Sequence, residues 1–120
     1  YSYGCNYARS IANSLREDGV QVDLLVYIAG DLIEDGPLTW PDNVGRVVSI
    51  RARGMVVLGG DLFYNRQEIT GARNVRLGCG HFSAPKRGET LAVVLEELAA
   101  LTPGGPGGPC RPEGPTGCGR

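Results

Sequence analysis

Two side chains in this sequence have the types and the surroundings that acyl-transfer chemistry requires. Ser2 lies between two tyrosines and just before Gly4, a pattern typical of a tight turn that presents a nucleophilic serine at the start of a helix. A serine hydroxyl needs a general base in order to act as a nucleophile. Because His81 is the only histidine, we expect Ser2 and His81 to form a nucleophile–base pair. The alternative for His81 is a surface loop histidine without a catalytic role.

The segment after Ser2 predicts the helix that such a turn needs. Apolar side chains recur at helical spacing from Gly4 to Asp18, and Gly19 follows as a C-terminal cap. A second helix is expected from Arg87 to Leu101 by the same criterion. The expected buried faces are Ala8, Ile11, Ala12 and Leu15 in the first helix and Leu91, Val94, Leu95 and Leu98 in the second.

Apolar segments between these helices predict strands. Val20–Ala29 is a near-continuous apolar run, which favours a strand buried on both faces of a parallel sheet. Gly45–Arg51 and Asn74–Leu77 are shorter candidates, and Met55–Leu58 either extends the second strand or forms a short edge. This alternation of helices and strands is typical of an α/β fold with a mostly parallel sheet and flanking helices.

Two segments rich in turn-forming residues interrupt or follow these elements. Residues 30–43 form a long loop, in which Trp40 either lines a pocket or anchors the loop. Most residues of 102–120 are Gly or Pro. We expect this tail to be disordered, because it buries too little apolar surface to offset an ordering cost of about 1–2 kcal/mol per residue. The chain is therefore divided into a folded part, 1–101, and a Pro/Gly-rich tail, 102–120.

The composition narrows the classes of partner. The chain has 120 residues, 42% of them hydrophobic, and a net charge of −1, as expected for one globular domain or a piece of one. The 12 basic residues are scattered and balanced by 13 acidic ones, which argues against nucleic acid as a partner. No apolar run approaches the ~20 residues of a membrane span. The four cysteines form no C-x-x-C pair, so we expect neither a metal nor another cofactor.

The order of these features resembles the C-terminal half of an α/β-hydrolase. The resemblance rests on Tyr1-Ser2-Tyr3-Gly4, the strand Val22–Ile28 and the late Gly80-His81. It covers residues 1–101. Within the superfamily, the chain is most similar to thioesterase-like members. The resemblance implies a serine hydrolase that cleaves a small-molecule ester or thioester through an acyl-enzyme, without a cofactor. It also implies N-terminal strands that the 120 residues do not contain, so we expect the chain to be a fragment with a partial α/β-hydrolase fold.

The resemblance also implies an acid that orients the histidine, located after one of two strands. Thioesterase-like relatives carry it at a position that corresponds here to Ala29, and the nearest carboxylate is Asp31. The other usual location corresponds to Asp61, with Glu68 further along. We rank Asp31 first and Asp61 second. The alternative for each is a solvated loop acid that caps nearby N–H groups.

The family implies two donors for the oxyanion. One is the backbone N–H of Tyr3, next to the nucleophile. The other comes from an earlier loop that these residues do not contain, so we expect the 120-residue chain by itself to be inactive or slowed by about 100- to 1000-fold. A hypothesis from a different class is a non-catalytic α/β binding or interaction module, in which Ser2 merely begins a helix. Neither of the common glycine-rich phosphate-binding motifs occurs to support it.

Overall fold

The computed structural model describes residues 1–30, 40–53 and 68–101. These ranges form, in order, helix α1 (Gly4–Glu17), strands β1 (Val22–Ile28), β2 (Val44–Ala52) and β3 (Arg73–Leu77), the short 3-10 helix η2 (His81–Lys86) and helix α2 (Gly88–Leu101). The predicted helices and the three main strands are confirmed, with ends that differ by no more than two residues. The predicted segment Met55–Leu58 and the tail 102–120 lie outside the described residues.

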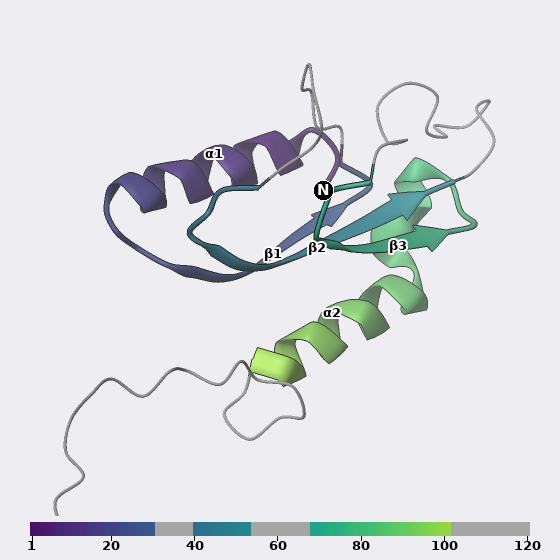
Figure 1. Ribbon diagram of the computed structural model, residues 1–120. Helices are drawn as coiled ribbons and strands as arrows, with labels where there is room; N and C mark the ends of the chain where they lie inside the picture. The colour runs from purple at the N-terminus through teal and green to yellow at the C-terminus, as the bar shows by residue number, and fades with distance from the viewer. Residues whose placement is uncertain (31–39, 54–67, 102–120) are drawn as a thin grey trace, which may run out of the picture.

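The three strands form one parallel sheet in the order β1-β2-β3. Val26 pairs with Val48, and Ile50 pairs with Val75. Helix α1 covers one face of the sheet and α2 covers the other (Figure 1). The expected α/β class, with a parallel sheet and flanking helices, is therefore confirmed. Because the strands are parallel, all their carboxyl ends lie at one edge of the sheet. The loops that follow the different strands meet at this edge.

The core has one layer on each side of the sheet. Strand β1 divides its side chains between the layers, because successive side chains of a strand point to opposite faces. The layer toward α1 consists of Cys5, Ala12, Leu25, Tyr27, Val44, Val47 and Ile69. The layer toward α2 consists of Ala29, Val48, Ile50, Ala52, Leu77, Cys79 and Ala84. This burial on both faces is what the near-continuous apolar run of β1 predicted. None of the helices within the described ranges is both long and apolar enough to cross a bilayer.

The buried faces of the two helices were predicted only in part. In α1, Ala8 and Ala12 lie against the core as expected, but the Ile11 side chain is 60% exposed. In α2, Val94 packs toward the sheet as expected. The prediction was wrong for the three leucines of α2, which are about half exposed: Leu91, Leu95 and Leu98.

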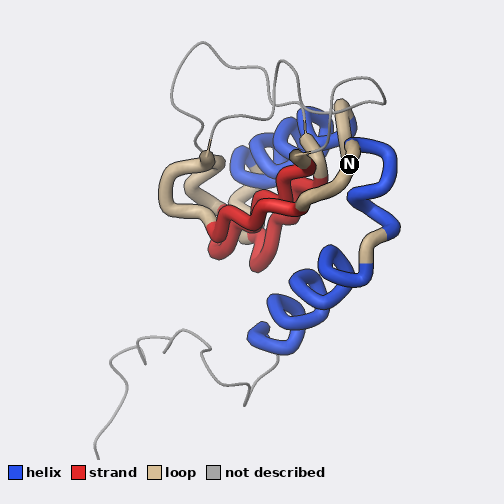
Figure 2. Tube along the Cα trace, turned by 90° about the vertical axis from the view of Figure 1, so that its right-hand side faces the viewer, coloured by secondary structure: helices blue, strands red, loops and turns tan. Residues whose placement is uncertain are grey.

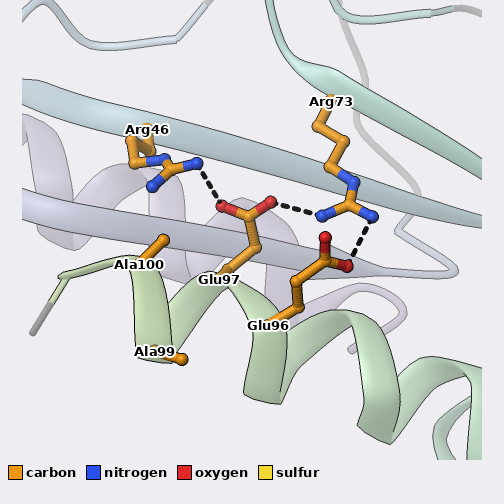
Figure 3. Close-up of a pocket in the computed structure, with 6 residues that line it drawn as sticks. All are labelled: Arg46, Arg73, Glu96, Glu97, Ala99 and Ala100. Atoms are coloured by element: carbon orange, nitrogen blue, oxygen red, sulfur yellow. Dashed lines mark hydrogen bonds and ion pairs between the residues drawn. The ribbon is translucent and has the colours of Figure 1, made fainter. Parts of the chain in front are cut away.

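An ionic cluster sets the rotation of α2 about its axis. The buried Glu97 carboxylate lies 3.0 Å from the Arg46 guanidinium of β2 and 2.7 Å from that of Arg73 of β3. Glu96 binds Arg73 at 2.8 Å, and Ala99 and Ala100 complete the lining of the shallow pocket around these side chains (Figure 3). Glu96, and with it Glu97, raises the pKa of Arg73 further above neutral pH. Hydrophobic periodicity treats a glutamate as solvent-facing, so it could not predict that Glu97 faces the sheet.

Gly71 gives a testable measure of packing on the α1 side. Its φ is +81°, and a Cβ added to it would lie 2.6 Å from the ring of Trp40, which packs against the core layer. Trp40 is therefore a packing residue of the α1-side layer. We expect Gly71→Ala to lower the free energy of unfolding by about 1–3 kcal/mol, through backbone strain and overpacking. Urea denaturation measures the change.

Gly78 provides the matched control for this substitution. A Cβ at Gly78 would meet no atom within 4 Å, so Gly78→Ala should change the unfolding free energy by less than about 0.5 kcal/mol. Equal losses in the two variants would contradict the packing of Trp40 on Gly71.

Candidate active site

The fold brings Ser2 and His81 together. The Ser2 Oγ lies 2.8 Å from the His81 Nε2, although 79 positions separate the two residues. Ser2 precedes Tyr3, the N-cap residue of α1, and His81 begins η2. The N-terminus lies beside this short helix in Figure 2. The structure thus places the two predicted side chains within hydrogen-bond distance, and their catalytic role remains a prediction.

The backbone of Ser2 adopts the conformation of a tight, strained turn. Its φ is +53°, a left-handed conformation that costs a non-glycine residue about 1–2 kcal/mol. The Ser2 N–H donates to the Ile28 carbonyl at the end of β1, and the Ser2 carbonyl accepts from the Cys5 N–H of α1, both at 3.0 Å. Strained residues persist where surrounding contacts hold them, and they concentrate at functional sites. The turn is therefore held between β1 and α1 with its hydroxyl toward His81.

The segment just after β1 packs closely beneath this turn. Ala29 is fully buried with φ +44°, and its N–H donates to the Ile50 carbonyl at 2.7 Å. A Cβ at Gly30 would lie 2.6 Å from the Cys5 sulfur. Among the described residues, Ser2 and Ala29 are the two non-glycine residues with positive φ. Both lie at the carboxyl edge of the sheet. Ala29 directly follows Ile28, and the Ser2 N–H donates to the Ile28 carbonyl.

The segment that carries His81 is anchored to α2. Ala84 of η2 is fully buried in the α2-side layer. Its carbonyl accepts a hydrogen bond from the buried Thr90 hydroxyl at 2.5 Å. The Ser83 hydroxyl also donates to the carbonyl of Gly80, the N-cap residue of η2, at 3.0 Å. These contacts hold the imidazole over the carboxyl edge, although no regular pattern in the sequence predicted η2.

Two aromatic rings flank the imidazole of His81. The Tyr1 ring lies 5.1 Å away at an angle of 36°, and the Phe82 ring lies 5.4 Å away at 89°. The Tyr1 hydroxyl donates to the His81 carbonyl at 3.2 Å. Desolvation raises the pKa of Tyr1 above its ordinary value near 10, so the phenol keeps its donor proton at neutral pH. Tyr1 is next to Ser2 in the sequence, but no sequence pattern predicted its contact with His81, which is 80 positions away.

The acid predicted to orient His81 is not among the contacts that the structure describes. Asp31 and Asp61, the two candidates, lie outside the described residues. Within those residues, no side chain hydrogen-bonds the Nδ1 of His81. Glu68 is engaged elsewhere, because hydrogen bonds from Arg76 and Arg51 hold its carboxylate and lower its pKa. The choice between Asp31 and Asp61 therefore stays a prediction.

At the N-terminus of α1, the backbone N–H beside Ser2 has no hydrogen-bond partner among the described residues. The N–H groups of Gly4, Cys5 and Asn6 donate to the carbonyls of the three residues that begin the chain. The Tyr3 N–H, in contrast, makes no hydrogen bond within the described part of the chain. The first turn of α1 also contains no acidic side chain, so no local negative charge opposes an anion at this helix end. Tyr3 N–H thus has the location expected of an oxyanion donor.

Comparisons with known proteins found no relative of this chain. No known protein family matches the chain, and no match was found among curated proteins or solved structures. Any function proposed for the chain therefore depends on the geometry at the carboxyl edge of the sheet.

The described residues contain no grouping of metal ligands. No three His, Cys, Asp or Glu side chains within them lie close enough to hold an ion. Cys5 and Cys79 are buried cysteines, one in each core layer. Cys110 and Cys118 lie outside the described residues. Among the described residues at the carboxyl edge, the groups suited to acyl transfer are the Ser2 hydroxyl, the His81 imidazole and the Tyr3 N–H.

Proposed function

We propose that this chain carries the nucleophile and the general base of a serine hydrolase of the α/β-hydrolase type, acting on an ester or thioester through an acyl-enzyme. The observation that supports this most directly is the distance of 2.8 Å between the Ser2 Oγ and the His81 Nε2. Three further observations support it: the left-handed φ of Ser2, its location between a parallel strand and a helix, and a Tyr3 N–H that makes no hydrogen bond to any described residue.

The proposed reaction uses these groups in sequence. With His81 neutral and protonated on Nδ1, its Nε2 accepts the Ser2 hydroxyl proton while the Oγ attacks the substrate carbonyl carbon. The Tyr3 N–H donates to the oxyanion of the tetrahedral intermediate. The imidazolium then returns the proton to the leaving alkoxide or thiolate, which breaks the bond to the carbonyl carbon. A water molecule, deprotonated by the same imidazole, then attacks the acyl carbon. The bond from this carbon to the Ser2 Oγ breaks, and the imidazolium returns the proton to the Oγ.

Covalent labelling tests the proposed nucleophile. A fluorophosphonate probe should label the full-length protein at Ser2, as located by peptide mass spectrometry. Labelling should be lost in Ser2→Ala and strongly slowed in His81→Ala. Ser14, an exposed serine of α1, supplies the matched control, because Ser14→Ala should be labelled like the wild type. Unchanged labelling of Ser2→Ala would refute the assignment, and an unlabelled wild type would favour the non-catalytic binding module.

The same assay separates the two candidate acids. We propose Asp31 as the group that orients His81, with Asp61 as the alternative. The acid stabilises the imidazolium, so replacing it with asparagine slows labelling even when Ser2 and His81 are intact. Asp31→Asn and Asp61→Asn, compared singly, identify the carboxylate that the reaction needs.

A further inference from the structure

We infer that Tyr1 is a positioning residue for the general base, because it holds the backbone of the same histidine whose ring Ser2 contacts. This inference rests on the proposed hydrolase function. It adds a role for a side chain that neither forms nor breaks a bond in the reaction.

One dipeptide contacts His81 at two separate points. The Ser2 Oγ lies 2.8 Å from the Nε2 of the ring, and the Tyr1 hydroxyl donates to the main-chain carbonyl at 3.2 Å. The Tyr1 ring also lies against the imidazole, with 5.1 Å between the ring centroids. The position of the histidine backbone and the plane of its ring are therefore both defined relative to the nucleophile.

The two partners in this contact are anchored independently. Tyr1-Ser2 is held by the hydrogen bond from the Ser2 N–H to Ile28 of β1, and by that from the Gly4 N–H to the Tyr1 carbonyl. His81 is held through η2, where the Ala84 carbonyl accepts from Thr90 of α2. The first anchor is on strand β1 and the second is on helix α2. The contacts from Tyr1 and Ser2 to His81 join these two anchored segments at the reacting atoms.

Alignment at this point matters for the rate. Proton transfer from Ser2 to His81 requires the two atoms to stay within about 2.6–3.2 Å, and small misplacements of reacting groups slow enzymatic reactions strongly. Gly80, the residue before His81, is extended, and its carbonyl accepts hydrogen bonds from Ser83. The bond from Tyr1 adds a restraint on the carbonyl of His81 itself.

Kinetics of the full-length protein test the inference. Tyr1→Phe keeps the ring and removes the donor, so we expect kcat for a p-nitrophenyl ester to fall about 2- to 10-fold with KM unchanged, the effect of one neutral hydrogen bond. Tyr1→Leu also removes the ring against the imidazole and should lower kcat further. Tyr7→Phe is the matched control: Tyr7 is 65% exposed, and its hydroxyl makes no hydrogen bond within the described residues.

A spectroscopic readout reports directly on the base. His81 is the only histidine of the 120 residues, and comparison with His81→Ala identifies its imidazole ¹⁵N signals. In Tyr1→Phe the Nε2 signal should move toward that of Ser2→Ala, in which the hydrogen bond from the serine is absent. Equal unfolding midpoints for Tyr1→Phe and the wild type show that the fold is unchanged, as expected for a side chain that is 44% exposed.

The outcomes distinguish this inference from the proposed function. If Ser2 is labelled but Tyr1→Phe has the kcat and imidazole signals of the wild type, the positioning role is overturned and the nucleophile stands. A rise in KM with unchanged kcat would also overturn it, because Tyr1 would then act on substrate binding. If the probe does not label Ser2 in the wild type, the proposed function itself fails.

Discussion

Replacing either Ser2 or His81 with alanine should lower kcat/KM for ester hydrolysis by roughly 10³- to 10⁶-fold, and replacing both should cost little more than either change alone. The reason is that, in the proposed mechanism, the two side chains act as one unit. Their reacting atoms lie 2.8 Å apart, and the hydroxyl is a poor nucleophile without the imidazole that takes its proton. Once one partner is missing, the other has no remaining contribution to lose.

The double substitution makes this measurement specific. Steady-state rates of the full-length protein with a p-nitrophenyl ester are compared for the wild type, both single variants and the double variant. The activity that remains should be similar in all three variants, since it comes from oxyanion stabilisation and binding alone. Losses that multiply in the double variant would show that Ser2 and His81 act independently, and would contradict a nucleophile–base pair. Far-ultraviolet circular dichroism confirms that the variants keep their helices and strands.

Glu97→Gln should lower the free energy of unfolding by about 2–4 kcal/mol. Removing one member of a buried ion pair typically costs about 3–5 kcal/mol, because the remaining charge is left desolvated and unpaired. Glu97 is 5% exposed and pairs with both Arg46 and Arg73. Since these two guanidinium groups are about one-third exposed, solvent screens part of the loss. Domains of this kind are stable by about 5–15 kcal/mol, so the loss is a large fraction of the total.

Glu96 provides a control in the same turn of α2. It binds the same Arg73 at 2.8 Å, but its side chain is 66% exposed. Because exposed ion pairs contribute about 0–1 kcal/mol, Glu96→Gln should change the urea midpoint little. Equal effects of the two substitutions would contradict a buried, bridging role for Glu97, and with it the explanation for the orientation of α2.

The sheet and helices followed from short-range patterns in the sequence. The spacing of Ala8 and Ala12 and the cap at Gly19 predicted α1, and the continuous apolar run of β1 predicted a strand covered on both faces. Such patterns depend on the period of each element, which neighbouring residues determine. They were insufficient for α2, where the apolar stripe of leucines lies toward solvent and Glu97 lies toward the sheet.

By itself, the sequence determined the order of the α/β elements and the two side chains able to act as nucleophile and base. A serine in a tight turn before a helix and a single histidine are visible as residue types and positions. Only the tertiary structure decided that Ser2 and His81 meet, that Tyr1 holds the histidine carbonyl, and that Glu97 joins α2 to β2 and β3. The physical reason is that these contacts join residues far apart in the chain. Their distances depend on how separately formed elements pack together, which no local pattern of residues encodes.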